Sequence, residues 1–362
     1  MKGGHKHLVL GIMLAFTCAL AHAEPYLAVV EGMKCAQCHV NPTGGGLRTV
    51  FGNAYAQSQL AATRLDTGDS IWTGAIGSML ALGGNVRAAA TVTEIPHQEQ
   101  TSAFELSQAR VYVNVAMVPN RLSIYFDEAV APNAASNREA LIRYQSASNR
   151  WSLKAGKMYL PFGLRLQDDS AFVRQVPGIN MNTPDVGLEF DWEPGAWSVQ
   201  AAVSNGSAGG PESDTGKQYS AQAAYVSRRW RIGTAANLND ADAGDRQAIG
   251  LFGGVKTGPI AWLGEVDYVQ DQALGDTTRR LLAGLVEGDW RIRQGHNFKL
   301  TWELFDPDTD IDNDQQTRIS TVYEYTPIQF LQLRGGLRYY DGIPQSDLQN
   351  RRLYFVELHG FY

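Results

Sequence analysis

This chain of 362 residues has few cysteines, no excess of positive charge and no long apolar run beyond its N-terminus. The missing apolar runs exclude membrane-spanning helices downstream of the first residues. The formal net charge of −6 gives no basic field, so we do not expect a nucleic-acid partner. Paired catalytic carboxylates, a nucleophile elbow and a phosphate-binding loop are also missing, which argues against a conventional enzyme.

The N-terminal residues have the pattern of an export signal. A basic start is followed by LVLGIMLAFTCAL and by the small-x-small triplet Ala21-His22-Ala23. This pattern predicts a signal peptide over residues 1–23 and a mature chain that begins at Glu24. A retained membrane anchor is the alternative. Cleavage would remove Cys18 and leave two of the three cysteines.

Those two cysteines belong to a C-x-x-C-H motif made of Cys35, Cys38 and His39. A cysteine pair in an exported protein can form a disulfide, a metal site or two thioether bonds to haem, and the adjacent histidine favours haem. The spacing lets both thiols reach one porphyrin edge and lets His39 be the proximal iron ligand. Because the sequence lacks further zinc ligands and a thioredoxin-like pattern, we predict one covalent haem c.

The residues around the motif predict a small module that depends on the rest of the chain. The NPTGGG segment at 41–46 cannot continue a helix, and its glycines would let the backbone wrap closely over a flat cofactor. Met79 is a candidate sixth ligand, although it also fits an ordinary residue leading into a strand; Met33 is too close to Cys35. The module at 24–60, followed by a linker at 61–80, is too short to bury haem alone.

From residue 81 to 362 the hydrophobic pattern has a period of two, which indicates strands with one apolar and one polar face. The apolar positions include Val111, Val113, Val115, Ile260, Trp262, Val266, Leu300, Trp302 and Leu304. A soluble sandwich would share such faces between two sheets, whereas a membrane barrel turns them to lipid and its charged faces to a wet lumen. Mixed charges on the polar face predict a hydrated, salt-bridged wall without ion selectivity.

The connections favour the barrel because tight turns alternate with long polar loops. The tight turns are expected at Pro119-Asn120, Ser148-Asn149, Pro194-Gly195, Ser227-Arg228, Thr257-Gly258, Gln294-Gly295 and Thr326-Pro327. Tryptophans beside these turns suit an interfacial girdle, and the last strand ends on an aromatic residue. We therefore predict an all-β fold: a transmembrane antiparallel barrel of about 16 strands in the bacterial outer membrane, with the N-terminal haem module at its periplasmic side or in its lumen.

Two resemblances sharpen the prediction. The segment LKAGKMYLPFGLRL at 153–166 resembles the strand and loop entry of phosphate-selective porins, although no dense ladder of pore lysines is present. The order of signal peptide, one C-x-x-C-H motif and barrel resembles the fused cytochrome-porins of the outer membrane, whose best-known members are implicated in iron(II) oxidation. The resemblance implies that Cys35 and Cys38 attach the haem and that His39 is its proximal ligand.

Three functions are compatible with these features. The first is electron transfer across the outer membrane, from extracellular iron(II) to a periplasmic carrier such as a soluble cytochrome, with the haem module as a plug. The alternative is a diffusion porin for small anions or other solutes, in which the N-terminal segment is a plug or a periplasmic docking module. A barrel that sheathes cytochromes from other chains is the third. Porin relatives are often trimers, so a homotrimer is expected by analogy.

Overall fold

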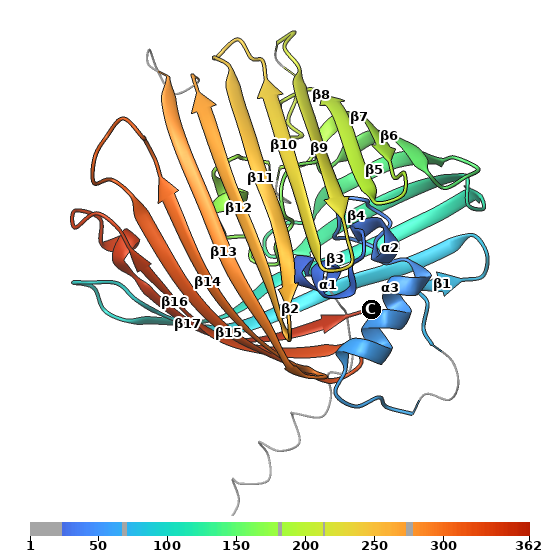
Figure 1. The fold of residues 1–362 in the computed structure, drawn as a ribbon, viewed down its shortest axis with the longest axis horizontal. Coiled ribbons are helices and arrows are strands. Elements are labelled where there is room, and N and C mark those ends of the chain that lie inside the picture. Colours follow the sequence, from blue (N-terminus) through green and yellow to red (C-terminus); the bar gives the residue numbers. More distant parts are fainter. Residues whose placement is uncertain (1–23, 67–70, 180–182, 213, 273–277) are drawn as a thin grey trace, which may run out of the picture.

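The computed structural model describes residues 24–66, 71–179, 183–212, 214–272 and 278–362, so the predicted signal peptide lies outside it. Sixteen antiparallel strands, β2 to β17, follow one another around a closed barrel (Figure 1). The last strand pairs with the first, from Arg352 opposite Glu94 to Phe361 opposite Asn85, and this pairing closes the barrel. Closure leaves no free sheet edge, which confirms the predicted barrel and its strand number.

The strands and helices have the following bounds. The barrel strands are β2 (Leu80–Glu94), β3 (Thr101–Val118), β4 (Leu122–Ala131), β5 (Ser136–Gln145), β6 (Trp151–Met158), β7 (Asp185–Trp192), β8 (Trp197–Ser204), β9 (Gln218–Val226), β10 (Trp230–Asn239), β11 (Arg246–Thr257), β12 (Ile260–Asp271), β13 (Arg279–Arg293), β14 (His296–Asp306), β15 (Gln316–Ile328), β16 (Leu331–Asp341) and β17 (Arg352–Phe361). The short strand β1 (Ala75–Ile76) pairs with β2. The helical segments are α1 (Pro25–Glu31), α2 (Cys35–Cys38), α3 (Val50–Tyr55), η1 (Ala56–Leu60), α4 (Phe172–Gln175) and η2 (Asp347–Asn350).

The two faces of each strand differ as the period of two predicts. On β14, Leu300 and Trp302 are 50% and 45% exposed on the outside, whereas Lys299, Thr301 and Glu303 are buried on the inside. An apolar outer surface on every side of a closed barrel is the surface that lipid requires. Among the described residues, no helix has the length and apolar character needed to cross a membrane.

The tight turns lie at one end of the barrel, and tryptophans surround that end. Trp192, Trp197, Trp230 and Trp290 are all nearly half exposed beside these turns, as an interfacial girdle requires. The turn predicted at Thr326-Pro327 is displaced: β15 continues through both residues to Ile328, and the chain reverses at Phe330, which has φ 74°. The ladder is irregular between Tyr325 and Ile328, and a proline fits there because it needs no ladder hydrogen bond at that point.

The barrel is partly filled from both ends. Helix α1 packs on β11 and β12. The segment between β6 and β7, described over residues 159–179 and called the inward segment below, folds into the lumen and packs α4 against β12, β13 and β14. Their apolar side chains form one buried cluster with inward-facing residues such as Ala261 and Leu263. The lumen wall is salt-bridged as predicted, but it is buried beneath these segments rather than openly hydrated, because both bring apolar side chains into the lumen.

Candidate functional site

The C-x-x-C-H motif forms a single helical turn at the mouth of the barrel with the tight turns. Cys35 and Cys38 begin and end α2, and residues three apart in a helix lie on the same side. His39 follows in an extended conformation (φ −120°, ψ 149°), and its N–H donates to the carbonyl of Cys35 at 2.9 Å. All three side chains line the same cavity.

The glycine-rich segment after the motif folds back on itself as a tight loop. Val40 N–H donates to the carbonyl of Leu47 at 3.0 Å, and His39 and Arg48 pair as an isolated bridge. Gly44 and Gly45 line the cavity, in agreement with the predicted close approach of this backbone. Gly46 has φ 65°, and a β-carbon there would lie 2.5 Å from the hydroxyl of Tyr125. The barrel wall therefore requires glycine at this position.

Polar contacts fix this loop to the inner barrel wall. The N–H of Leu47 donates to the Tyr125 hydroxyl at 3.2 Å. The amide of Asn41 donates to Glu139 at 3.3 Å, and its carbonyl oxygen accepts from Lys154 at 3.3 Å. These partners belong to β4, β5 and β6, so one side of the barrel holds the segment that follows the motif.

Helix α1 and the residues before the motif contact both the opposite side of the barrel and the side next to β6. Glu24 forms a buried ion pair with Lys299 on β14. Glu31 pairs with Arg291 on β13 at 3.2 Å, and Lys34 pairs with Glu193 after β7 at 3.0 Å. The N-terminal segment thus bridges the barrel mouth from wall to wall, and the barrel supplies the enclosure that so short a segment lacks.

The cavity at the motif contains about 920 Å³ of space not filled by atoms, part of it open to solvent. Apolar side chains from the N-terminal segment, the inward segment and β9 line it, among them Leu27, Tyr55, Leu60, Leu164 and Ala224. Three arginines, Arg48, Arg165 and Arg231, add positive charge.

His39 and the cysteines carry the lone pairs and thiols that a ligand would need. His39 is 4% exposed; its ring interacts with the backbone of Gly45 and Gly46, although neither ring nitrogen makes a hydrogen bond of normal geometry within the described residues. Burial and the charge of Arg48 lower the pKa of His39 to about 3, so the imidazole is neutral and keeps a lone pair. Cys35 and Cys38 are unpaired, and burial raises the pKa of Cys38 to about 11. These groups, in a partly apolar cavity, fit a covalently attached haem.

The structure does not bring Met79 to this site. Met79 is 51% exposed and lines a second cavity beside the turn between β3 and β4. Its carbonyl accepts from the N–H of Ala116 at 2.7 Å, which fixes it to the barrel wall at the start of β2. Met33, which sequence proximity to Cys35 had disfavoured, lines the motif cavity instead. The three cavity arginines were not predicted as site residues, since they are spread over three segments.

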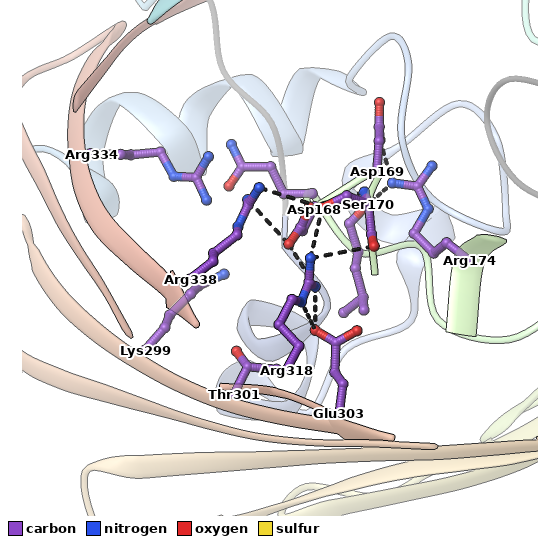
Figure 2. A network of polar contacts seen from close by, with 12 residues as sticks. Asp168, Asp169, Ser170, Arg174, Lys299, Thr301, Glu303, Arg318, Arg334 and Arg338 are labelled. Atoms are coloured by element: carbon purple, nitrogen blue, oxygen red, sulfur yellow. Dashed lines mark hydrogen bonds and ion pairs between the residues drawn. The ribbon is translucent and has the colours of Figure 1, made fainter. Parts of the chain in front are cut away.

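A second polar cluster fixes the inward segment (Figure 2). Arg318 on β15 donates to Asp168 at 2.9 Å and to the hydroxyl of Ser170 at 2.7 Å, and it also pairs with Glu303 on β14. Arg338 on β16 reaches the same Asp168 carboxylate at 3.1 Å. Every group in this cluster has a charged or hydrogen-bonding partner, so its geometry indicates a structural tie.

Comparison with known proteins bears on the barrel. No family model matches the chain, and neither does any curated protein. Solved structures do match. The fold is that of a porin. The anion-selective porin of Comamonas acidovorans aligns with TM-score 0.61 at 10% identity, over 78% of this chain and 99% of that one.

Two further structures give the same result. A trimer form of OmpT from Vibrio cholerae aligns with TM-score 0.60 at 11% identity, over 78% of this chain and 99% of that one. OprB of Pseudomonas putida aligns with TM-score 0.61 at 9% identity, over 78% of this chain and 94% of that one. At such identities the likeness concerns the porin-type fold and carries no information on the cysteine motif.

Proposed function

We propose that this chain is a porin-type barrel of the bacterial outer membrane that carries one covalent haem c at its mouth and transfers electrons across that membrane. One observation carries the proposal: Cys35, Cys38 and the buried, neutral His39 line a single cavity. The apolar belt, the tryptophan girdle and the porin-type fold support the membrane location.

The roles of the residues follow from their places. Cys35 and Cys38 would hold the haem by thioether bonds, and His39 would be an iron ligand, while the haem itself would supply one-electron redox chemistry. The barrel wall and the inward segment line part of this cavity. Because tight turns face the periplasm in such barrels, the cavity would exchange electrons with a soluble periplasmic carrier. Extracellular iron(II) is the proposed donor.

A diffusion porin for small anions or other solutes is the second candidate, and the comparisons favour it more directly. Among the matched structures, OmpT is described as an outer-membrane protein and the Comamonas acidovorans protein as an anion-selective porin. A second opening of about 1750 Å³, part of it solvent, lies beside the N-terminal segment and is lined by Arg121 and Arg143. In this function the N-terminal segment would be a partial plug. Either function is compatible with a homotrimer, the form described for OmpT.

The deciding experiment combines spectroscopy with conductance. The full chain would be purified from outer membranes of cells that also express the cytochrome c maturation machinery. A haem c spectrum that survives denaturation and acid-acetone extraction, with little current in planar bilayers, would support the first function. Steady ohmic current and no covalent haem would support the diffusion porin. A Cys35→Ala/Cys38→Ala variant is the control, since its current reports the barrel alone.

A further inference from the structure

Arg48 is a buried cation without a counter-charge. It is 5% exposed, and both terminal nitrogens of its guanidinium group are buried without a hydrogen-bond partner. No carboxylate of the described residues forms an ion pair with it. Its Cζ lies over the ring of Phe361, 5.5 Å from the ring centre. An uncompensated buried charge is unfavourable by several kcal/mol, on the order of 3 or more, unless a ligand supplies the partner.

The surrounding protein cannot supply that partner. The acidic groups that line the cavity are Glu24 and Glu31, which already pair with Lys299 and Arg291. Several buried cations elsewhere in the lumen pair with carboxylates, as Arg110 does with Asp127 and Arg334 with Glu324. Arg87 instead donates to the carbonyl of Gln167 at 3.4 Å. Arg48 differs from these in that both of its terminal nitrogens lack a hydrogen-bond partner.

The guanidinium group of arginine is charged at neutral pH. A guanidinium group with free terminal nitrogens presents the paired donors that match a carboxylate. The feature therefore points to an acidic ligand in the cavity rather than to a neutral one.

Arg165 is the second arginine at the cavity. It comes from the inward segment; its Nη2 donates to the carbonyl of Leu160 at 2.9 Å, and its Nε is buried without a hydrogen-bond partner. Its charge and that of Arg48 both act on the imidazole of His39, so both lie within electrostatic range of the motif. Arg231 differs, because its Nη1 lies 3.9 Å from the Sγ of Cys35, at the attachment side.

We propose that Arg48, together with Arg165, binds the two propionate carboxylates of the haem held by Cys35, Cys38 and His39. The inference rests on the proposed function. It agrees with haem chemistry, because the propionates lie on the porphyrin edge away from the vinyl groups that receive the thiols. The N-terminal segment and the inward segment would then close around the cofactor from two sides, each with one arginine.

The test is the midpoint potential of the full, haem-loaded chain and its dependence on pH. Arg48→Gln leaves an ionised carboxylate unpaired, which favours ferric iron, so the potential should fall. The expected size is about a tenfold change in the ratio of reduced to oxidised protein at a fixed potential. The potential should also vary more with pH, because the carboxylate now titrates. Arg165→Gln should act in the same direction, and Arg48→Lys should restore most of the effect.

Arg150→Gln, at an exposed turn residue, is the matched control and should change neither quantity. Haem-loaded Arg48→Gln and Arg165→Gln proteins with unchanged potential and pH dependence would overturn this inference and leave the haem proposal intact. Wild-type protein without covalent haem would overturn both. If Arg48→Gln does not accumulate, the potential of haem-loaded Arg165→Gln gives the decision.

Discussion

At the scale of single residues, the site depends on backbone approaches that a side chain would block. Gly46 lies against the Tyr125 hydroxyl, and Gly52 lies so close to the Cys38 carbonyl that a β-carbon would stand 2.2 Å from its oxygen. Both approaches bring the motif close to its neighbours. The geometry of the cavity therefore depends on the absence of a side chain at Gly46 and Gly52 as well as on the residues that line it.

Gly46→Ala is expected to destabilise the protein by about 2–4 kcal/mol, from a left-handed backbone and a clash with Tyr125. Urea unfolding in lipid vesicles measures the change. Gly195→Ala is the control, because Gly195 also has a positive φ (53°) but has no atom within 4 Å of an added β-carbon. Only the backbone cost of about 1 kcal/mol should remain there. Equal losses at both sites would remove the contact with Tyr125 from the explanation.

The Cys38 thiol of haem-free protein should react slowly with a maleimide. Burial raises its pKa to about 11, so the reactive thiolate is scarce at pH 8 and increases as the pH rises. In a Cys35→Ser background, the rate at pH 8 should be about a hundredfold below that of the urea-unfolded chain. A rate equal to that of the unfolded chain would mean that this thiol is not enclosed.

At the scale of elements, α1 and the inward segment pack inside the barrel and partly fill its lumen. The apolar face of α1 carries Tyr26, Leu27, Val29 and Val30, all buried. The inward segment contributes backbone donors to wall carboxylates: Leu164 N–H donates to Glu265 at 2.8 Å and Phe172 N–H to Glu303 at 2.7 Å. Each element is held by both apolar and polar contacts with the barrel.

Val29→Asp should release the N-terminal segment from the barrel. The new carboxylate would be buried without a partner, at a cost on the order of 3 kcal/mol or more. Faster protease cleavage in the linker near residues 61–66 and a larger bilayer current are the expected readouts. Val50→Asp provides the comparison, since Val50 is 59% exposed. Protection equal to wild type in Val29→Asp would contradict the packing of α1.

At the scale of the whole molecule, the polar and apolar surfaces are inverted relative to a water-soluble protein. Buried charges line the inside, and exposed apolar side chains cover the outside of the strands. The arrangement is stable only if lipid surrounds the barrel, because water would leave an apolar surface exposed on every strand. The membrane is thus part of the folding environment.

Leu300→Arg, on the outer face within β14, should cost about 2–4 kcal/mol in lipid, because the new charge faces the hydrocarbon region. Ile292→Arg, on an equally exposed position near the tight turns, should cost about 0–1 kcal/mol, since it lies near the interface. Reversible urea unfolding in vesicles gives both values. Equal costs would contradict the assigned depth of these residues.

The sequence was most informative where one physical constraint repeats. Lipid outside and polar groups inside impose the same alternation on every strand, so the barrel and its closure were predictable from the sequence alone. The motif was recognisable because two thiols and an imidazole at fixed spacing serve few chemistries. Both features rest on residues that are neighbours in sequence.

Features that join distant residues were not predictable. The inward path of residues 159–179 depends on Glu265 and Glu303, which follow Leu164 and Phe172 by about a hundred residues or more in sequence. The cavity arginines come from three segments that meet only when the barrel closes. Met79 suggested a ligand by its chemistry, but the pairing of β2 with β3 keeps it elsewhere. The direction of a loop and the contacts between distant side chains are set by tertiary structure, which local sequence patterns do not encode.

The pairing of β17 with β2 has a consequence for biogenesis. The N-terminal segment leaves the ribosome and the export channel first, whereas the strands that hold it, from β4 to β14, follow later. The barrel closes only when the final strand, β17, pairs with β2. Before that moment Cys35, Cys38 and His39 lie on an open chain that a maturation enzyme can reach. Attachment of the proposed haem would therefore have to precede closure of the barrel, because the closed barrel would block access to the motif.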